Sequence, residues 1–463
     1  MSQLLEQLRA FLGDAGLLEG ERARDAAQSN WSKLGEPLAV MRPSSVADVS
    51  RILALCNDAA QPIVPWGGKT GLVEGGNASD ALALSLDRLN RIETIDTACA
   101  TMTVEAGCIL QNATEAADSQ GLFFPLDLGA RGSATIGGNI STNAGGNRVI
   151  RYGMMRDMVL GLEAVLADGT IVSSLNRLIK NNAGYDLKQL FIGTEGTLGI
   201  VTRAVLRLRP KPGSHAVALV AVDSFAALPR LLRHVESGLG GSLSAFEVMW
   251  DDFYTLVTTP PAKGRPPLPH GHSHYVLIEQ LGSDDKADAE RFERVLGEFL
   301  ETGHAADAVI AKSESERQQI WALRDDVGQT MRNWPIFTFD VSLPISEMET
   351  YVDEVRRRLH ESWPEKASLM VFGHMGDGNL HLIASIGDGS AKSRHGVEAI
   401  VYGELDGRAG SVSAEHGIGL EKRAWLSSSR SVPEIAMMRR LKQALDPRGI
   451  LNPGKIFSLE IPA

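Results

Sequence analysis

Cysteine is scarce in this sequence, and basic residues are fewer than acidic ones. Cys56, Cys99 and Cys108 are its three cysteines, and they form no CxxC pair. A disulfide scaffold or an iron–sulfur cluster is therefore disfavoured, and a reducing compartment such as the cytoplasm is expected. Lysine plus arginine number 46 against 57 aspartates plus glutamates, a net charge of −11. Since no long basic run is present, we expect no nucleic acid partner.

Long apolar runs are also missing. None reaches the roughly 18 residues of a transmembrane candidate, so we expect no transmembrane segment, with peripheral attachment to a membrane as the alternative to a free cytoplasmic location. The N-terminal stretch places apolar residues at helical spacing (Leu4, Leu8 and Phe11) among early acidic residues. This pattern predicts an amphipathic helix rather than a signal peptide.

Glycine, in contrast, is abundant, with 47 of 463 residues against an average of roughly 7%. Many glycines fall in three clusters, at 65–76, 125–146 and 193–202. The first cluster contains Gly-Lys-Thr, but Ile63 stands where a Walker A motif needs glycine, and no GxGxxG lies between a strand and a helix. Because the clusters have little side-chain bulk, they predict backbone laid along one extended cofactor.

Strands and helices alternate along the chain. The pattern predicts a capped helix over 44–60, a strand running into the first glycine cluster, a helix over 110–120 and a hairpin at Asp168-Gly169. From Ala216 a second series of strands alternates with amphipathic helices over 285–303 and 346–363, and another helix precedes a turn-rich C-terminal tail. The Pro- and Gly-rich stretch 258–274 is expected to be a surface loop.

A short histidine motif, Gly373-His-Met-Gly-Asp-Gly-Asn-Leu-His381, contains an Asp-Gly turn signal flanked by apolar runs. A two-residue turn at Asp377-Gly378 would place His374 directly opposite His381. Opposed Cβ atoms lie roughly 4.5–5.5 Å apart, so two imidazoles can converge on one metal ion. Two surface histidines on a hairpin are the alternative, and a wider loop would preserve the ligand prediction.

The glycine-rich and histidine motifs, taken together, resemble those of one protein family. Residues 65–76, 133–146, 193–202 and 452–457 (PWGGKTGLVEGG, SATIGGNISTNAGG, GTEGTLGIVT and NPGKIF) resemble FAD-linked oxidoreductases of the vanillyl-alcohol oxidase and p-cresol methylhydroxylase type. GHMGDGNLH and SAEHGIG narrow the resemblance to the D-2-hydroxy acid dehydrogenase branch, which includes D-lactate and D-2-hydroxyglutarate dehydrogenases. The resemblance runs from about residue 32 to residue 457.

The resemblance implies an α+β fold. It comprises an N-terminal helical segment (1–31), an FAD-binding domain built from a small α/β part and a mainly antiparallel sheet (32–211), an α+β substrate and metal-binding domain with an antiparallel sheet (212–429), and a C-terminal helical segment returning to the FAD (430–463).

The resemblance also implies which residues bind FAD. The first loop contains no histidine for a covalent link, so the FAD is expected to be non-covalent. The implied FAD-binding residues are Pro65, Trp66, Gly67, Gly68, Lys69, Thr70, Gly71, Gly132, Ser133, Thr135, Gly137, Gly138, Asn139, Ser141, Asn143, Gly145, Gly146, Glu195, Gly196, Gly199, Ile200, Val201 and Asn452.

For the reaction, the resemblance implies that Glu415 joins His374 and His381 as metal ligands, with zinc as the expected ion and manganese, iron or cobalt as alternatives. It also implies that His416 is the base, that Arg324 binds the substrate carboxylate and that Asn379 lies near substrate and flavin. From its own segment alone, Arg324 is expected to be a solvated helix arginine paired with Asp325 or Asp326, and only the position in the family favours the substrate role.

The resemblance implies oxidation of a small D-2-hydroxy acid. The electron acceptor stays open between an electron-transfer flavoprotein, a quinone, a cytochrome and oxygen, and a homodimer is one option. Members acting on 2-hydroxyglutarate tend to carry a Lys and a Thr where this chain has Thr338 and Gly328, so a D-lactate-like or less polar monocarboxylic acid is favoured. The alternatives are a D-2-hydroxyglutarate dehydrogenase, a catalytically silent accessory subunit of an oxidase complex, and a metal-free alcohol oxidase.

Three further patterns are given no role in function. His270, His272 and His274 alternate, but their Pro- and Gly-rich context favours a solvated loop over a second metal site. Met437 and Met438 are expected in a helix core. Arg356, Arg357 and Arg358 are expected on a solvated helix face.

Overall fold

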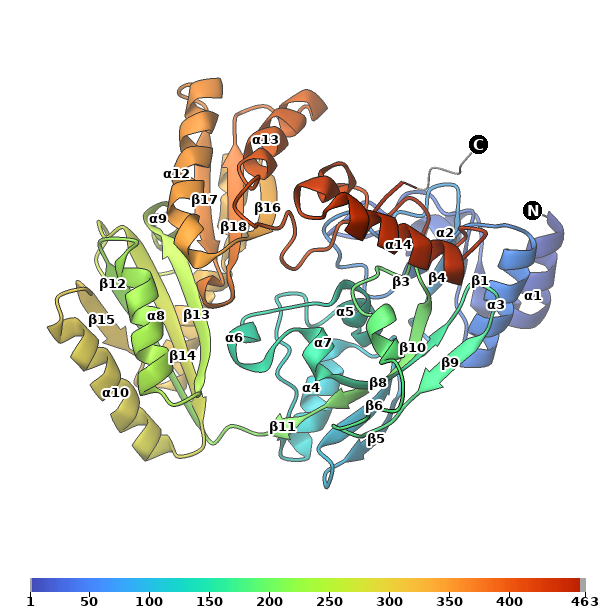
Figure 1. Ribbon diagram of the computed structural model, residues 1–463, viewed down its shortest axis with the longest axis horizontal. Helices are drawn as coiled ribbons and strands as arrows, with labels where there is room; N and C mark the ends of the chain where they lie inside the picture. Colours follow the sequence, from blue (N-terminus) through green and yellow to red (C-terminus); the bar gives the residue numbers. More distant parts are fainter. Residues whose placement is uncertain (1, 459–463) are drawn as a thin grey trace. The chain divides into compact units, whose positions relative to one another are not determined.

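The chain divides into two compact units (Figure 1). The first comprises Met1–Gly146, Gly153–Lys211 and Glu415–Ala463, and the second comprises Asn147–Tyr152 and Pro212–Ala414. Residues 415–429, assigned to the substrate domain from the sequence, cluster with the first unit. The computed structural model describes residues 2–458, so Met1 and the last five residues of the predicted C-terminal segment lie outside the described residues.

The first unit begins with a small α/β part. Its sheet has the strand order β1-β2-β4-β3, in which β4 is parallel to both β2 and β3. The predicted capped helix is confirmed as α3, because Ser45 and Asp48 form a capping box at its start. The elements are α1 (Ser2–Gly16), β1 (Leu17–Leu18), α2 (Glu21–Ala26), β2 (Ala39–Met41), α3 (Val46–Asp58), β3 (Ile63–Trp66) and β4 (Leu82–Ser85).

The first unit also contains an antiparallel sheet of order β5-β6-β10-β8-β9 and a two-stranded antiparallel sheet of β7 (Leu122–Phe123) and β11 (Arg209–Pro210). The Asp168-Gly169 hairpin is confirmed, because Gly169 has a φ of 88° and the Leu166 N–H donates to the Thr170 carbonyl at 2.9 Å. The strands are β5 (Ile92–Asp96), β6 (Thr101–Glu105), β8 (Val159–Val165), β9 (Ile171–Ser174) and β10 (Ile200–Arg207). The helices are α4 (Leu110–Ser119), α5 (Ile136–Thr142), α7 (Met155–Met158) and, near the C-terminus, α14 (Val432–Leu445).

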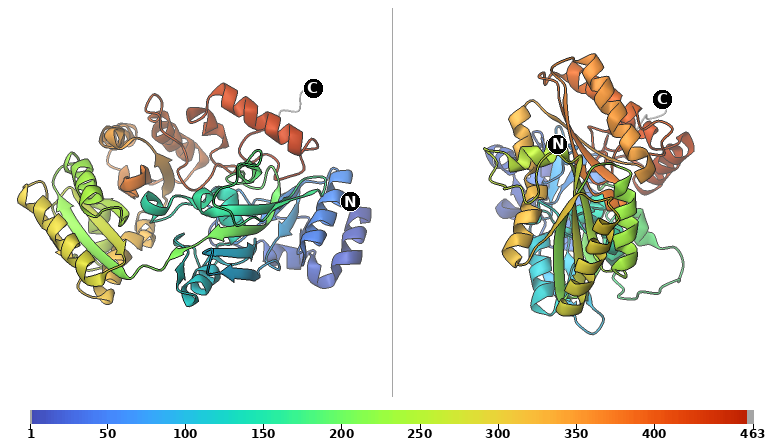
Figure 2. Two further views of the ribbon diagram at one scale, coloured as in Figure 1. Left: turned by 60° about the horizontal axis from the view of Figure 1, so that its bottom comes forward. Right: turned by 90° about the vertical axis from the view of Figure 1, so that its left-hand side faces the viewer.

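The second unit is built on a seven-stranded antiparallel sheet of order β15-β12-β14-β13-β17-β18-β16. Helices α8 and α10 lie side by side along one face of the sheet (Figure 2). The strands are β12 (Ser214–Val222), β13 (Leu243–Trp250), β14 (His274–Gly282), β15 (Asp307–Ile310), β16 (Phe337–Ser342), β17 (Ser368–Gly373) and β18 (Asn379–Ser385). The helices are α6 (Val149–Tyr152), α8 (Ala227–Gly238), α9 (Asp251–Thr258), α10 (Asp285–Glu301), α11 (Glu314–Asp325), α12 (Ile345–Ser362) and α13 (Ala391–Gly403).

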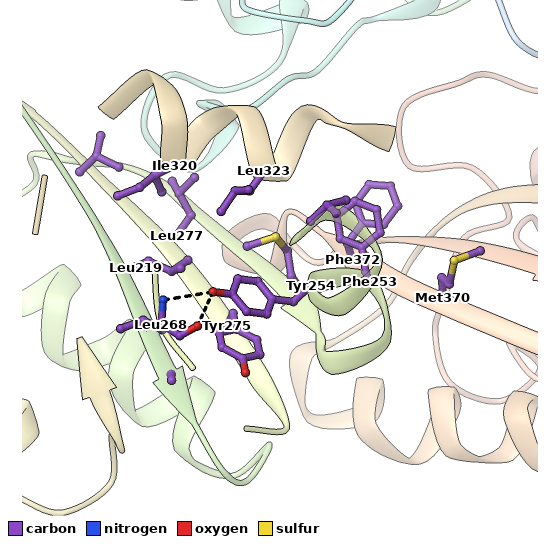
Figure 3. Packing of buried hydrophobic residues seen from close by; sticks show 14 of the residues in the cluster. Leu219, Phe253, Tyr254, Leu268, Tyr275, Leu277, Ile320, Leu323, Met370 and Phe372 are labelled. Atoms are coloured by element: carbon purple, nitrogen blue, oxygen red, sulfur yellow. Dashed lines mark hydrogen bonds between the residues drawn. The ribbon is translucent and has the colours of Figure 1, made fainter. Parts of the chain in front are cut away.

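An aromatic core lies between this sheet and helices α9 and α11 (Figure 3). Tyr254 stacks on Tyr275 with ring centroids 3.5 Å apart, and its hydroxyl donates to the Leu268 carbonyl. Phe253 stacks on Phe372 at 4.2 Å. Fully burying an aromatic side chain stabilises a fold by about 1.5–3 kcal/mol, so this core holds Phe372, on β17, firmly in place.

The predicted α+β architecture is confirmed, but two predictions about burial are wrong. Met437, on α14, is 57% exposed, and the residue that this helix buries is Lys442 instead. His274 is not part of a solvated loop, since it begins β14 and is 6% exposed. Among residues 2–458, no helix combines the length and hydropathy that crossing a membrane requires.

Candidate active site

The glycine clusters predicted from the sequence meet inside the first unit. A Cβ on Gly68 would lie 2.0 Å from the Ser133 carbonyl oxygen, so the first and second clusters touch through backbone. The second and third clusters are joined by the Glu195 N–H, which donates to the Ser141 carbonyl at 2.7 Å. Asn452 Nδ2 donates to the Glu195 carbonyl at 2.7 Å. Four segments far apart in sequence therefore build one glycine-rich surface.

Two buried amides at this surface have polar atoms without a hydrogen-bond partner among the described residues. They are Nδ2 of Asn139, which is 5% exposed, and Oδ1 of Asn452, which is 2% exposed. A buried polar group without a partner costs free energy, so its usual partner is a ligand or water. Gly71 adds open space, because a Cβ there would meet no atom within 4 Å. These features fit a long, polar cofactor such as FAD.

The side chains of two predicted cofactor residues have protein partners instead. Lys69 Nζ donates to the Ala26 carbonyl at 2.8 Å, and burial lowers the pKa of this amine. The Glu195 carboxylate accepts hydrogen bonds from the backbone N–H groups of Ile418 and Gly419 at 2.7 and 2.9 Å. Burial raises the pKa of Glu195 despite these donors. Glu195 therefore secures the loop that directly follows His416.

The histidine motif connects β17 to β18, and the predicted two-residue turn is wrong. Phe372, not His374, stands opposite His381 in the ladder. A short helical turn over Met375–Asp377 and the left-handed Gly378 (φ 89°) widen the connection. His374 and His381 are diagonal neighbours on one face, with ring centroids 5.3 Å apart. The pairing differs, but the two imidazoles still lie together as predicted.

The predicted metal ligands have donor atoms close to one another. Those of His374, His381 and Glu415 all lie within 4.8 Å of one another, and so do those of a second set, Asp340, His381 and His416. Asp340 stands opposite His381 in the β16–β18 ladder. Its Oδ2 also accepts from the Ala414 N–H at 3.1 Å, which holds the chain just before Glu415. Imidazole and carboxylate donors suit zinc and other first-row divalent metals.

Glu247 on β13 is a site residue that the sequence analysis missed. Its side chain is 1% exposed, and Oε1 lies 2.8 Å from His374 Nδ1. Its other oxygen, Oε2, accepts from Arg324 Nε at 2.8 Å. Burial alone would raise the pKa of Glu247, but His374 and Arg324 together lower it. The only sequence signal was a carboxylate within the otherwise apolar strand LSAFEVMW.

Arg324 is not a solvated helix arginine. Its side chain is 5% exposed at the end of α11, and its guanidinium carbon lies 4.9 Å above the Phe372 ring. Nη2 lies 3.2 Å from His374 Nε2. Among the described residues, Nη1 makes no hydrogen bond, so this end of the guanidinium remains for a ligand.

Asn379, the first residue of β18, is 3% exposed. Neither its side-chain oxygen nor its nitrogen has a hydrogen-bond partner among the described residues. An amide can donate two and accept two hydrogen bonds, so the expected partner of this buried amide is a ligand or a water molecule.

The alternating histidines do not form a second site in the part of the chain that is described. His270 bonds to Thr258 Oγ1, His272 to the Asp223 carboxylate and His274 to Ser273 Oγ. Burial, with a smaller effect of Arg356, lowers the pKa of His274 from 6.5 to about 4. These histidines therefore have separate structural partners.

Comparisons with known proteins identify the class. Residues 37–174 match the family model of an FAD binding domain, and residues 211–456 match that of the C-terminal domain of FAD linked oxidases. Because the second match covers more than half of the chain, the protein belongs to the FAD linked oxidase family.

The particular relatives agree with this class. A mitochondrial D-2-hydroxyglutarate dehydrogenase of Arabidopsis thaliana is 38% identical over 98% of this chain and 82% of its own length. D-2-hydroxyglutarate dehydrogenase of Xanthomonas citri pv. viticola is 40% identical over 91% of this chain and 89% of its own. The crystal structure of p-cresol methylhydroxylase shares the fold, with a TM-score of 0.79 at 18% identity over 99% of this chain and 97% of its own.

Proposed function

We propose that this protein is an FAD-dependent dehydrogenase that oxidises a D-2-hydroxy acid to the 2-oxo acid with the help of a divalent metal ion. The observation that carries the proposal is the grouping of the donor atoms of His374, His381 and Glu415, together with the buried Arg324 beside His374. The dehydrogenases named among the relatives support the substrate class.

Each site residue has one task in this proposal. Arg324 binds the substrate carboxylate through Nη1, because Nε and Nη2 already bond to Glu247 and His374, and such a charge-assisted hydrogen bond is stronger than a neutral one. His374, His381 and Glu415 would hold the metal, and the buried amide of Asn379 would orient the acid. His416 would take the hydroxyl proton as general base, a role suited to a histidine near neutral pH.

The two bound groups supply what side chains lack. A divalent metal would lower the pKa of the substrate hydroxyl, and non-covalent FAD would accept the hydride from Cα. Zinc is the metal we favour for two imidazoles and one carboxylate. The glycine-rich surface with Asn139 and Asn452 would hold the FAD, because its backbone amides and open space suit a pyrophosphate-containing ligand.

We propose a monocarboxylic substrate of the D-lactate type. Thr338 stands on β16, on the same face as Asp340 and His381, and carries no charge for a second carboxylate. Gly328, where relatives acting on 2-hydroxyglutarate tend to carry Thr, offers no hydrogen bond either. D-2-hydroxyglutarate is the second candidate, favoured by the names of the relatives.

The electron acceptor and the compartment are further proposals. An electron-transfer flavoprotein, a quinone or a cytochrome would reoxidise the flavin. The three unpaired cysteines suit a reducing compartment such as the cytoplasm, whereas the relative from Arabidopsis thaliana is named as mitochondrial.

Flavin bleaching tests this function. The purified holoprotein is mixed without oxygen with D- and L-lactate, D-2-hydroxyglutarate and longer D-2-hydroxy acids, and the oxidised flavin band is followed. We expect fast bleaching by D-monocarboxylic acids, its loss after chelation and its recovery on adding zinc. The variant His416→Ala should keep both FAD and metal but lose bleaching.

The contrary outcomes separate the alternatives. No bleaching with any acid would support a silent accessory subunit. Full bleaching after complete removal of metal would support a metal-free alcohol oxidase, and fastest bleaching by D-2-hydroxyglutarate would contradict the monocarboxylic preference. Unchanged bleaching in His416→Ala would contradict its assignment as base.

A further inference from the structure

The hydrogen bonds around His374 define which ring nitrogen carries the proton. Nε2 of His374 lies 3.2 Å from Arg324 Nη2, and Nδ1 lies 2.8 Å from Glu247 Oε1. A guanidinium donates hydrogen bonds and accepts none. Nε2 must therefore accept, so the proton sits on Nδ1 and is donated to Glu247. This tautomer places the lone pair on Nε2, where a metal would take the position of Arg324 Nη2, while Arg324 would keep its bond from Nε to Glu247.

The same carboxylate also holds Arg324. Glu247 Oε2 accepts from Arg324 Nε at 2.8 Å, while Phe372 supports the guanidinium from below at 4.9 Å. All three charged or polar side chains in this group are nearly fully buried, at 1% for Glu247, 5% for Arg324 and 6% for His374. Because all three side chains are so little exposed, loss of Glu247 would leave His374 Nδ1 and Arg324 Nε without a protein partner, which is costly in a buried site.

We propose that Glu247 is a positioning residue. Its one buried carboxylate determines which nitrogen of His374 can bind a metal and also fixes the orientation of the Arg324 guanidinium. This inference rests on the proposed function, which supplies the metal and the hydroxy acid. β13 is thereby a third strand of the site, because Glu247 stands next to the Val248–Gly373 pair of the β13–β17 ladder and so faces the end of β17. Metal ligation and acid recognition share one support.

The variant Glu247→Gln tests the proposal, because it keeps the side-chain shape but has only one accepting oxygen. One of the two donors, His374 Nδ1 or Arg324 Nε, then meets an NH₂ group. We expect the zinc affinity of the chelator-treated, FAD-loaded protein to fall about 10–100-fold, the loss typical for a residue that orients a metal ligand. The KM for the hydroxy acid should rise while the FAD content stays unchanged.

Glu279→Gln is the matched control. Glu279 is also a fully buried carboxylate with an arginine and a histidine as partners, Arg148 and His215, but it does not bond to His374 or Arg324. Its substitution should lower thermal stability and leave zinc affinity at the wild-type value. Titration calorimetry with zinc alone measures affinity for all three proteins.

The outcomes separate this inference from the function. If the wild-type protein binds zinc and Glu247→Gln has the same zinc affinity and the same KM as the wild type, the inference about Glu247 is overturned and the proposed function stands. Wild-type protein that binds no divalent metal would overturn the proposed function as well. Should Glu247→Gln fail to fold, ¹⁵N-histidine NMR of the wild type decides. The His374 signal, assigned by its loss in His374→Gln, is expected to show the proton on Nδ1, and a proton on Nε2 would refute the proposal.

Discussion

Three buried carboxylates in this protein differ in what surrounds them. Glu279 accepts from Arg148, His215, Trp321 and Ser244, and these partners overcome burial and lower its pKa strongly. The pKa of Glu247 is lowered by His374 and Arg324. Burial raises the pKa of Glu195 although two backbone N–H groups and two lysines, Lys422 and Lys455, act against it. The direction of the pKa shift of a buried carboxylate therefore depends on whether its partners outweigh the loss of solvent, as His374 and then Arg324 do for Glu247.

His274 makes stability depend on pH. Its pKa is about 4 in the folded protein, because of burial first and Arg356 second, against 6.5 when unfolded. Between these values the unfolded chain binds more protons, so stability is lost as the pH falls from about 6.5 towards 4. At pH 5 this single group costs about 2 kcal/mol relative to neutral pH.

The variant His274→Phe should remove this dependence, because phenylalanine keeps the ring packing against Trp250 and Phe225. Urea unfolding at pH 7.5 and pH 5, followed by tryptophan fluorescence, is expected to show a smaller loss of unfolding free energy in the variant than in the wild type. The exposed His360→Gln serves as control. Equal losses in His274→Phe and wild type would refute the assignment.

Single residues were predictable where chemistry and local motif coincide. His374 and His381 stand in one short motif whose residue types suggest a metal site, and the resemblance to a family added Glu415 and His416; the structure brings donor atoms of all four together in two overlapping sets. Glu247 stands in no such motif, because its partners lie 77 and 127 positions further along the chain, at Arg324 and His374. Which strand pairs with β13 is decided by the whole sheet, and no local pattern encodes it.

At the scale of elements, strand β16 is the edge of the second unit's sheet and borders the site. Asp340 pairs with His381, and Thr338 pairs with Ile383. Alternate residues of a strand share a face, so Thr338 stands on the site face, two residues from Asp340. Thr338 is exposed, so a longer side chain fits at this position.

We therefore expect Thr338→Lys to shift substrate preference toward D-2-hydroxyglutarate. A charge-assisted hydrogen bond to its distal carboxylate contributes about 1.5–3 kcal/mol, so the kcat/KM ratio of D-2-hydroxyglutarate to D-lactate should rise about tenfold or more. Steady-state kinetics with both acids measure this. Thr338→Met, similar in length but uncharged, is the control, and an equal ratio in both variants would contradict the prediction.

Helices and strands followed from periodicity, whereas register did not. The capping box of α3 and the hairpin at Gly169 are local and were predicted. The connection after His374 was predicted as a two-residue turn, but the helical turn over Met375–Asp377 shifts the pairing by two positions. Asp-Gly satisfies the left-handed φ of Gly378 in either arrangement, so the turn signal alone could not separate them.

In the whole molecule, a buried cation joins distant parts of the first unit. Lys442 Nζ donates to the carbonyls of Thr197 and Leu451 and pairs with Asp446 at 2.5 Å. Asp446 in turn accepts from the N–H groups of Ile450 and Leu451. This network secures the segment that carries Asn452 against the third glycine cluster.

Lys442→Met should destabilise the protein by about 3–5 kcal/mol, the cost of removing one partner of a buried ion pair. Asp446 would then be buried without its countercharge, and FAD should be released at a lower temperature. Thermal unfolding and the appearance of free flavin fluorescence measure both effects. The exposed Arg440→Met on the same helix is the control, and identical melting of the two variants would rule out this role.

The broad architecture was predictable because the glycine clusters and the strand and helix patterns occur in family order. The assignment of the C-terminal segments to one of the two units was less predictable. Residues 415–429 join the first unit because Glu195 and the carbonyl of Val73 bind the backbone N–H groups that follow His416. Such contacts arise from folding of the whole chain, not from composition.

The pairing of Ile63 with the chain near Leu451 has a consequence for biosynthesis. The Ile63 N–H donates to the Ile450 carbonyl, and the Asn452 N–H donates back to the Ile63 carbonyl. During translation the Ile63 edge of β3 therefore stays unpaired until the chain has been made as far as Asn452. Since Asn452 also bonds to the Glu195 carbonyl, the glycine-rich surface is completed only at that point. FAD is therefore expected to bind after residue 452 has been synthesised, and not while the first glycine clusters emerge from the ribosome.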